Sequence, residues 1–156
     1  EDVAERAHGR GASVVTDGAR LLNAVAASGV PADRWADPVD ALWIDLSKGL
    51  GCPGGAVLAG SADFLDEANR WKFMLGGAMR QSGILAAAGL YALDHHVERL
   101  PEDHATAQRL AEGLADAGFA VEQPETNIVF FDSSPVGLDL EAAAAAFAER
   151  GIGVIV

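Results

Sequence analysis

Short apolar runs that stop at glycine-containing turns constrain the fold of this chain more than any other feature. Residues 12–16 form one such run and residues 39–46 a second, and both contain β-branched side chains. Runs of this length between turn residues are typical of strands buried on both faces of a sheet. Between them, residues 21–28 have the pattern of a short apolar helix that Gly29 ends. The alternation of strand, helix and strand therefore predicts part of an open, largely parallel α/β sheet.

The order of the remaining segments predicts a second, smaller part of the fold. Residues 47–55 are too rich in glycine to form a regular element, and residues 56–59 form a third apolar run. Long helices and then short strands follow, which is the order of an α+β layer. We therefore expect residues 1–80 to form part of a large α/β domain, and residues 81–156 to form connecting helices and a small C-terminal α+β domain. The expected segments are a helix end at 1–9, helices at 63–74, 79–100, 101–117 and 140–150, and strands at 119–122, 127–131 and 152–156.

Charge and cysteine content exclude several classes of partner. The chain has 23 Asp and Glu against 11 Lys and Arg, which gives a formal net charge of −12. Because so acidic a chain repels a polyanion, we expect no nucleic acid partner. No stretch reaches the about 20 apolar residues that a helix needs to cross a bilayer, so we expect no membrane partner. The single cysteine excludes an internal disulfide and fits a reducing compartment, so the expected localisation is cytoplasmic.

Two side chains that directly follow predicted strands could carry chemistry. Lys48, which with Lys72 makes up all the lysines of the chain, stands between an apolar strand and a glycine-rich turn. A lysine presented into a cleft there would be a competent Schiff-base nucleophile, whereas a solvated loop lysine would have no such role. Asp17 ends the other strand, and ligands of open α/β sheets bind at the carboxyl ends of the strands. An Asp-Gly pair is also an ordinary turn, so the residues alone leave both interpretations open.

Three further patterns predict no site. Residues 49–54 match the dinucleotide-binding pattern G-x-G-x-x-G, but an apolar strand follows them where that pattern requires a helix. The histidines His95, His96 and His104 flank a proline break without the spacing of an established metal motif, so we expect no metal. Cys52 has no obvious histidine partner, and we expect it to pack as a small residue in the turn.

Three ordered motifs together resemble the low-specificity L-threonine aldolase family. These proteins are beta-eliminating lyase-like, fold-type I enzymes that depend on pyridoxal phosphate (PLP). The motifs are DGAR at residues 17–20, LSKGLG at 46–51 and GGAMRQ at 76–81, and the stretches at 86–93, 102–104 and 126–129 are similar to the family as well. The resemblance spans about residues 13–156. Three motifs in the family's order are far more specific than any one of them.

The resemblance implies a role for four residues. Lys48 would form the aldimine with PLP, and Asp17 would pair with the pyridinium nitrogen and keep it protonated, so that the ring accepts electrons. Arg20 would lie near the cofactor and help to hold the substrate carboxylate, which suits a planar guanidinium. Arg80 matches a family arginine that lies near the cofactor and reaches in from a neighbouring subunit, so a homo-oligomer, dimer or tetramer, is implied. The family reaction cleaves a small β-hydroxy-α-amino acid such as threonine to glycine and an aldehyde.

The chain departs from the family pattern in sequence and in length. Val15 stands where the family usually has histidine, Cys52 where it has alanine, and Ala78 where it has glycine. These departures bear on substrate preference more than on cofactor chemistry. Family members are about twice as long, as a PLP-binding domain plus a second domain requires. The resemblance therefore implies a fragment, whose missing N-terminal half would carry the phosphate-binding loop and the histidine that stacks on PLP.

Two other interpretations stay open. The same scaffold could serve another fold-type I lyase, or an aldolase for bulkier substrates such as phenylserine, because function depends on the site and not on the fold. Alternatively, the chain is a catalytically incomplete domain that assembles with a partner. The favoured expectation is a PLP-dependent carbon–carbon lyase of amino acid metabolism that acts through Lys48.

Overall fold

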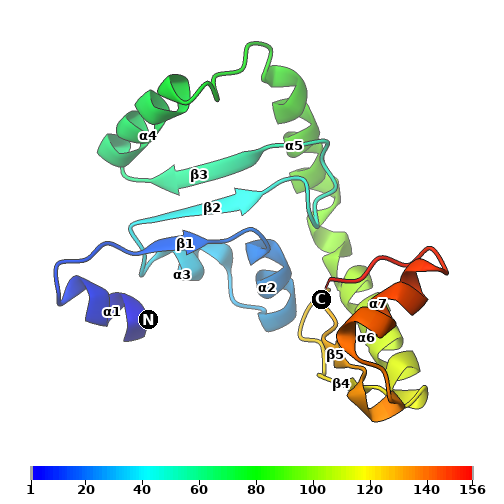
Figure 1. The fold of residues 1–156 in the computed structure, drawn as a ribbon. Helices are drawn as coiled ribbons and strands as arrows, with labels where there is room; N and C mark the ends of the chain where they lie inside the picture. Colours follow the sequence, from blue (N-terminus) through cyan, green and yellow to red (C-terminus); the bar gives the residue numbers. More distant parts are fainter. Residues whose placement is uncertain (1, 156) are drawn as a thin grey trace. The chain divides into compact units, whose positions relative to one another are not determined.

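The first part of the chain forms a unit around a three-stranded sheet. The computed structural model describes residues 2–155 and divides into two compact units, Glu1–Leu100 and Pro101–Val156. The alternation of strand and helix that the sequence predicts is present in the first unit. Its elements are α1 (Asp2–His8), β1 (Val15–Asp17), α2 (Leu21–Ser28), α3 (Ala32–Ala36), β2 (Ala41–Asp45), β3 (Ala56–Gly60), α4 (Ala62–Met74), α5 (Gly83–His95) and the 3-10 turn η1 (Val97–Arg99) (Figure 1).

Strand β2 lies between β1 and β3, and the sheet is mixed. β1 and β2 are parallel, with Asp17 opposite Trp43, whereas β2 and β3 are antiparallel, with Asp45 opposite Ala56. A short loop can join antiparallel strands, but parallel strands need a crossover of a dozen or more residues. The connection over residues 46–55 contains no helix or strand. β3 therefore reverses direction, whereas the sequence predicts a largely parallel sheet.

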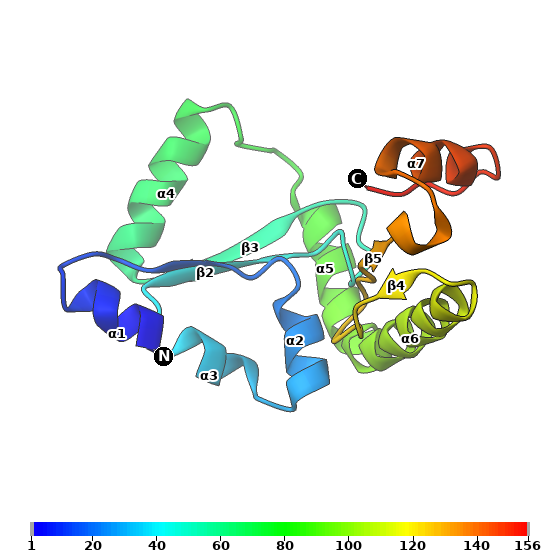
Figure 2. The ribbon, with the colours of Figure 1, turned by 60° about the horizontal axis from the view of Figure 1, so that its bottom comes forward.

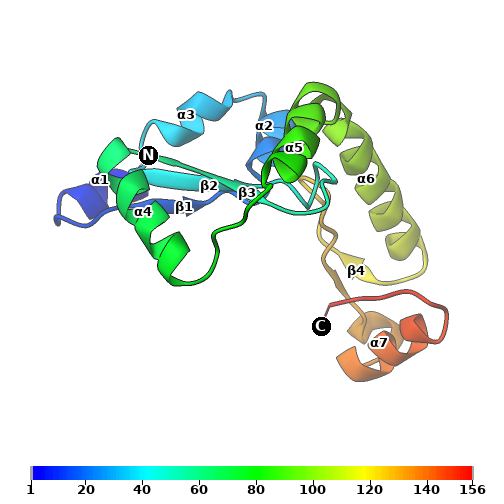
Figure 3. The same cartoon turned by 90° about the horizontal axis from the view of Figure 1, so that it is seen from above.

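The strands are less buried than their apolar sequences predict. Val15 in the edge strand β1 is 57% exposed, and every residue of β3 is exposed. Of the three strands of this sheet, only β2 carries buried side chains, at Ala41 and Leu42. Helices α2 and α3 lie on one face of the sheet and α4 on the other (Figures 2 and 3). The edge strands therefore keep apolar surface that this unit does not cover.

A small core lies beside the loop that follows β2. It consists of Leu46, Leu50, Cys52 and Ala92, with partly buried Leu22, Ala88 and Val97 packed against it. Cys52 is 7% exposed, which confirms that it packs as a small residue in the turn. The loop 46–55 thus contributes three of its own side chains to the core, although it has no regular structure.

The helix predicted over residues 79–100 is wrong in its bounds. Residues 77–82 are irregular, and Gln81 adopts a left-handed backbone conformation with φ of 55°. Several large apolar side chains of α5 face away from the core, since Ile84 is 75% exposed and Tyr91 58%. Its small residues face the core instead: a Cβ atom added at Gly89 would lie 3.0 Å from a methyl carbon of Leu46. The close approach of this helix to the loop selects glycine and alanine over bulkier residues.

The second unit is a short hairpin between two helices. Its elements are α6 (Leu100–Asp116), β4 (Ala120–Val121), β5 (Phe131–Asp132), the 3-10 turn η2 (Ser134–Val136) and α7 (Leu140–Ala148). β4 and β5 pair antiparallel, and the rings of Phe119, Phe131 and Phe147 pack at centroid distances of 5.5–6.2 Å. β4 is shorter than the strand predicted at 119–122, β5 overlaps the strand predicted at 127–131 only at Phe131, and residues 152–155 form no strand.

The first unit extends to Leu100, beyond the predicted boundary at residue 80, because α5 and η1 pack against α2 and the loop 46–55. A division by contacts does not define the domains of a longer protein. The assignment of residues 1–80 and 81–156 to two domains therefore stays a prediction.

Candidate functional site

The predicted site residues Asp17 and Lys48 lie at the carboxyl ends of neighbouring parallel strands. Asp17 is the last residue of β1 and lies opposite Trp43, and Asp45, two residues further along, ends β2. The carboxyl ends of parallel strands meet at one edge of a sheet, and this edge is where open α/β sheets bind ligands. The structure therefore places Asp17 and the start of the Lys48 loop at the same sheet edge.

Asp45 organises the first turn of the Lys48 loop. Its Oδ1 accepts hydrogen bonds from the Ser47 backbone N–H at 2.6 Å, the Ser47 hydroxyl at 2.6 Å and the Lys48 backbone N–H at 3.2 Å. The Ser47 hydroxyl and N–H lower the pKa of the Asp45 carboxyl, and the Lys48 ammonium lowers it further. An aspartate that caps its own following residues in this way is an Asx turn. The turn fixes the backbone of Lys48 relative to the end of β2.

The Lys48 side chain folds back over the end of β2. Its Nζ lies 3.4 Å from Oδ2 of Asp45 and 5.5 Å from the centroid of the Trp43 ring. The side chain of Lys48 is 38% exposed and that of Asp45 16% exposed. An ammonium held between a carboxylate and the face of an indole has a preferred position while staying accessible from solvent. Lys48 is thus a held amine with an open side, rather than a freely solvated loop lysine.

The turn after β1 presses Gly18 against β2. A Cβ atom added at Gly18 would lie 2.6 Å from the carbonyl oxygen of Trp43, so only glycine fits there. Asp17 is exposed, and its Oδ1 accepts a hydrogen bond from the Ala19 N–H at 3.0 Å. Arg20 stands at the N-terminus of α2 and is exposed as well. The DGAR turn thus packs closely on the strand that leads to Lys48, while its charged groups face outward.

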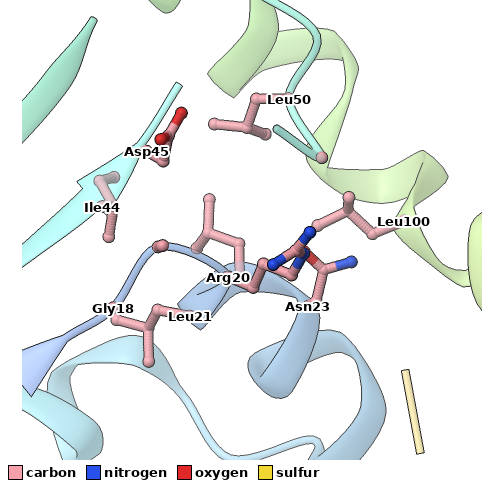
Figure 4. Close-up of a pocket in the computed structure, with 11 residues that line it drawn as sticks. Gly18, Arg20, Leu21, Asn23, Ile44, Asp45, Leu50 and Leu100 are labelled. Carbon is pink, nitrogen blue, oxygen red and sulfur yellow. The ribbon is translucent and has the colours of Figure 1, made fainter. Parts of the chain in front are cut away.

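A cavity of about 10 Å³ lies between this turn and the Lys48 loop (Figure 4). It is lined by Arg20 and Asn23 on one side and by Ile44 and Asp45 on the other, and Asp17 and Lys48 do not line it. About 10 Å³ is the space that a single water molecule needs. The residues around the β1–α2 turn and the Lys48 loop therefore enclose a cavity the size of one water molecule.

Arg80 does not lie at this cavity. It lies in the irregular segment between α4 and α5, where it is exposed, and it does not line the cavity. Of the four predicted site residues, the structure groups Asp17, Arg20 and Lys48 around the ends of β1 and β2 and leaves Arg80 on a separate segment.

Sequence reasoning missed two residues that shape the loop. Asp45 was signalled only by the Asp-Leu-Ser order at residues 45–47, which is typical of an Asx turn. Asn23 is 2% exposed, and its side-chain amide packs on Gly49, where an added Cβ atom would lie 2.9 Å from its Oδ1. No local signal in the sequence points to this contact between α2 and the loop.

Residues 56–60 form a strand, so the glycine pattern at 49–54 opens no helix. Among residues 2–155, no group of three or more His, Cys, Asp or Glu side chains could hold a metal ion. No helix of the described chain is long and apolar enough to span a membrane.

A family model described as beta-eliminating lyase matches residues 1–134. This chain belongs to the beta-eliminating lyase family. It is 49% identical over 121 residues to the low-specificity L-threonine aldolase of Escherichia coli (strain K12), covering 78% of this chain and 36% of that protein. It is 44% identical over 135 residues to low-specificity L-threonine aldolase 1 of Arabidopsis thaliana, covering 85% of this chain and 38% of that protein.

Solved structures of the family have the same fold. A candidate L-allo-threonine aldolase from Listeria monocytogenes superposes with a TM-score of 0.78 and 27% identity, covering 99% of this chain and 44% of that chain. The mixed α/β architecture is therefore that of the threonine aldolases. The chain spans less than half the length of the relatives that it matches.

Proposed function

We propose that this chain supplies the lysine-bearing part of a PLP-dependent carbon–carbon lyase. The enzyme would cleave a threonine-like β-hydroxy-α-amino acid to glycine and an aldehyde. The observation that carries the proposal is the fixed position of Lys48 at the sheet edge to which β1 brings Asp17 and Arg20. Identity of 49% to a low-specificity L-threonine aldolase supports the same reaction class.

The side chains at this edge fit the chemistry of PLP. An amine, a carboxylate and a guanidinium are the groups needed for the cofactor's aldehyde, its ring nitrogen and an anionic substrate group. The cavity of about 10 Å³ is too small to enclose the cofactor. We therefore propose that the phosphate and the outer face of the ring are contacted by residues outside this chain, from the part of its relatives' length that it does not span.

Each of the three residues would then have one task. When bound, PLP acts as an electron sink for the bond that breaks at the α-carbon of the substrate. Lys48 would hold the cofactor through its Nζ. In the structure, Asp45 forms an ion pair with this Nζ. Oδ1 of Asp17 accepts the Ala19 N–H, so Oδ2 is the atom proposed to accept the ring N–H. Arg20 would bind the substrate carboxylate through its planar fork.

A second candidate is a lyase or aldolase for aromatic substrates. A candidate aromatic amino acid beta-eliminating lyase/threonine aldolase from Exiguobacterium superposes on this chain with a TM-score of 0.78 and 25% identity. Val15 and Cys52, which depart from the usual pattern of the aldolases, lie on β1 and within the Lys48 loop, respectively. Phenylserine cleavage in preference to threonine would favour this candidate.

We also propose that this chain assembles with other copies of itself. Trp71, Phe73 and Met74 at the end of α4 are 47–63% exposed, and such apolar surface is typical of protein–protein contacts. We propose a homo-oligomer, dimer or tetramer, in which Arg80 of this segment reaches a neighbouring site. The free, buried Cys52 is compatible with the proposed cytoplasmic location.

Glycine formation by lysine variants tests the reaction. With PLP added, we expect the Lys48→Ala variant to form glycine from threonine at least about 10³-fold more slowly than the unmodified protein. Lys72→Ala removes the only other lysine, on exposed α4, and should retain the rate. Equal loss in the two variants would contradict a specific role for Lys48. No glycine from either threonine or phenylserine, even in the unmodified protein, would leave the incomplete domain as the better description of this chain.

A further inference from the structure

The loop that carries Lys48 is closed by its own backbone. The Leu46 N–H donates to the Gly55 carbonyl at 3.0 Å, and the Cys52 N–H donates to the Leu46 carbonyl at 2.9 Å. Within this ring, the Gly51 N–H donates to the Lys48 carbonyl at 2.9 Å, with Gly51 in a left-handed conformation. These bonds shape the loop, but they tie it only to itself. Its direction relative to the rest of the unit must come from other contacts.

Helix α5 supplies a directed contact through the residue that caps it. His96 is half-buried, and its Nδ1 lies 2.6 Å from the carbonyl oxygen of Leu50, two residues beyond Lys48. A carbonyl oxygen can only accept, so Nδ1 carries the hydrogen and donates it. The backbone N–H of His96 donates to the Ala92 carbonyl at 2.8 Å. One residue therefore ties the end of a helix to the turn that follows Lys48.

The neighbouring histidine makes no such contact. Nδ1 of His95 lies 2.9 Å from the Tyr91 carbonyl oxygen, one turn back in its own helix. Its ring stacks on Tyr91 with 4.2 Å between centroids and 9° between planes. His95 is exposed, and these contacts are all with its own helix, α5. The two histidines have the same side-chain chemistry and adjacent positions at the end of the helix, but only His96 contacts the loop.

We propose that His96 is a positioning residue for Lys48, acting through the hydrogen bond from its Nδ1 to the Leu50 carbonyl. The inference rests on the proposed function of Lys48. A buried carbonyl that loses its donor must find water, and the loop would open to provide it. Displacement of a reacting group by about 1 Å is enough to lower a rate by about 10²-fold. The bond thus links the packing of α5 to the position of the reactive amine.

Three variants separate the hydrogen bond from the bulk of the ring. His96→Leu keeps a side chain of similar size but removes the donor. His96→Asn restores an N–H donor at the same bond separation from Cα as Nδ1. His95→Leu is the matched control, because it removes the adjacent imidazole without touching the loop.

Two measurements report on the loop without the cofactor. The first is hydrogen exchange of the amides in peptides covering residues 46–55, with peptides from the second unit as the internal reference. The second is the ratio of acetylation at Lys48 to acetylation at Lys72 by limiting acetic anhydride. We expect His96→Leu to accelerate exchange in the loop about tenfold and to change the acetylation ratio about threefold. His96→Asn and His95→Leu should stay close to the unmodified protein.

The outcomes separate the positioning role from simple packing and from the proposed function. Unchanged exchange and acetylation in His96→Leu would overturn the proposal, as would a His96→Asn variant as perturbed as His96→Leu. If His96→Leu loosens the whole protein, including the reference peptides, rescue by His96→Asn decides the matter. Because neither readout contains PLP, a Lys48 that took no cofactor would refute the proposed function and leave the role of His96 in holding the loop to be judged by these measurements alone.

Discussion

Two neighbouring regions of the first unit are built in opposite ways. In the Lys48 loop, residues 46–55, Leu50 is 3% exposed although the segment has no regular structure. The α4 arm, which we define as residues 56–82, contains the regular elements β3 and α4, yet Phe73 within α4 is 63% exposed, and Leu75 directly after it is 80% exposed. Regular structure and burial therefore do not coincide in this chain. The irregular loop that carries Lys48 is fixed by packing, whereas the α4 arm keeps apolar side chains exposed.

The largest expected effect comes from a matched pair of leucines. Leu50→Ala should lower the free energy of unfolding by about 2–5 kcal/mol, because it removes buried methyl groups from the core under the loop. Leu75→Ala should change it by less than about 0.5 kcal/mol, because that side chain is exposed. Urea unfolding followed by circular dichroism measures both. Comparable destabilisation by the two variants would mean that the α4 arm is covered in solution.

A pair of glycines gives a smaller effect. Gly18→Ala would place a Cβ atom 2.6 Å from the Trp43 carbonyl oxygen, so the β1–α2 turn must move away from β2. We expect a loss of about 1–3 kcal/mol in the free energy of unfolding. Gly83→Ala, at the start of α5, meets nothing within 4 Å and should be neutral or stabilising by up to about 1 kcal/mol. An unchanged free energy of unfolding in Gly18→Ala would contradict the close packing of the DGAR turn on β2.

The smallest expected effect is electrostatic and appears only in acid. Hydrogen bonds from Ser47 lower the pKa of the Asp45 carboxyl below its usual 3.8, and Arg70 similarly lowers the pKa of Glu67 on α4 below 4.5. A lowered pKa means that the carboxylate stabilises the fold above the usual value, and that this contribution is lost as the pH falls through the lowered one.

Variants of these two acids sharpen the comparison of loop and arm. We expect the melting temperature of Asp45→Asn to fall less steeply between about pH 5 and pH 2 than that of the unmodified protein. Glu67→Gln should behave similarly at low salt, but its effect should vanish in about 0.5 M NaCl, because the side chains of Arg70 and Glu67 are 57% and 54% exposed. Equal salt sensitivity in the two variants would contradict the distinction between a packed loop and an open arm.

Local signals in the sequence were sufficient for much of the fold. The bounds of α2 follow from an apolar run that ends at Gly29, which has a φ of 70°. The glycine content of residues 47–55 predicts an irregular loop, and the loop is irregular. The sequence analysis did not predict the antiparallel direction of β3. The short connection without a helix could have indicated it, because parallel strands need a longer crossover. The exposure of β1 and β3 could not be predicted, because it depends on what covers the sheet and not on the strand sequence.

The candidate site was predicted in part. The sequence singles out Lys48 and Asp17 because they lie at the ends of apolar strands, and the parallel pairing of β1 and β2 brings these ends to one edge of the sheet. Contacts between segments far apart in the sequence left no local pattern. Asn23 meets Gly49 across 26 positions, the difference between 49 and 23, and His96 meets Leu50 across 46. Such partners of the Lys48 loop are visible only once α2 and α5 are packed against it.

We propose that Lys48, and not Lys72, is the amine that holds PLP. The most direct test is to incubate the purified chain with PLP, reduce it with borohydride, digest it and locate the added pyridoxyl mass. The two lysines differ in the ways that the structure distinguishes, since Lys48 lies 3.4 Å from Asp45 on the packed loop and Lys72 lies on the exposed α4. We predict label on Lys48 and little on Lys72. Label on neither lysine, or equal label on both, would contradict an organised cofactor site in this chain.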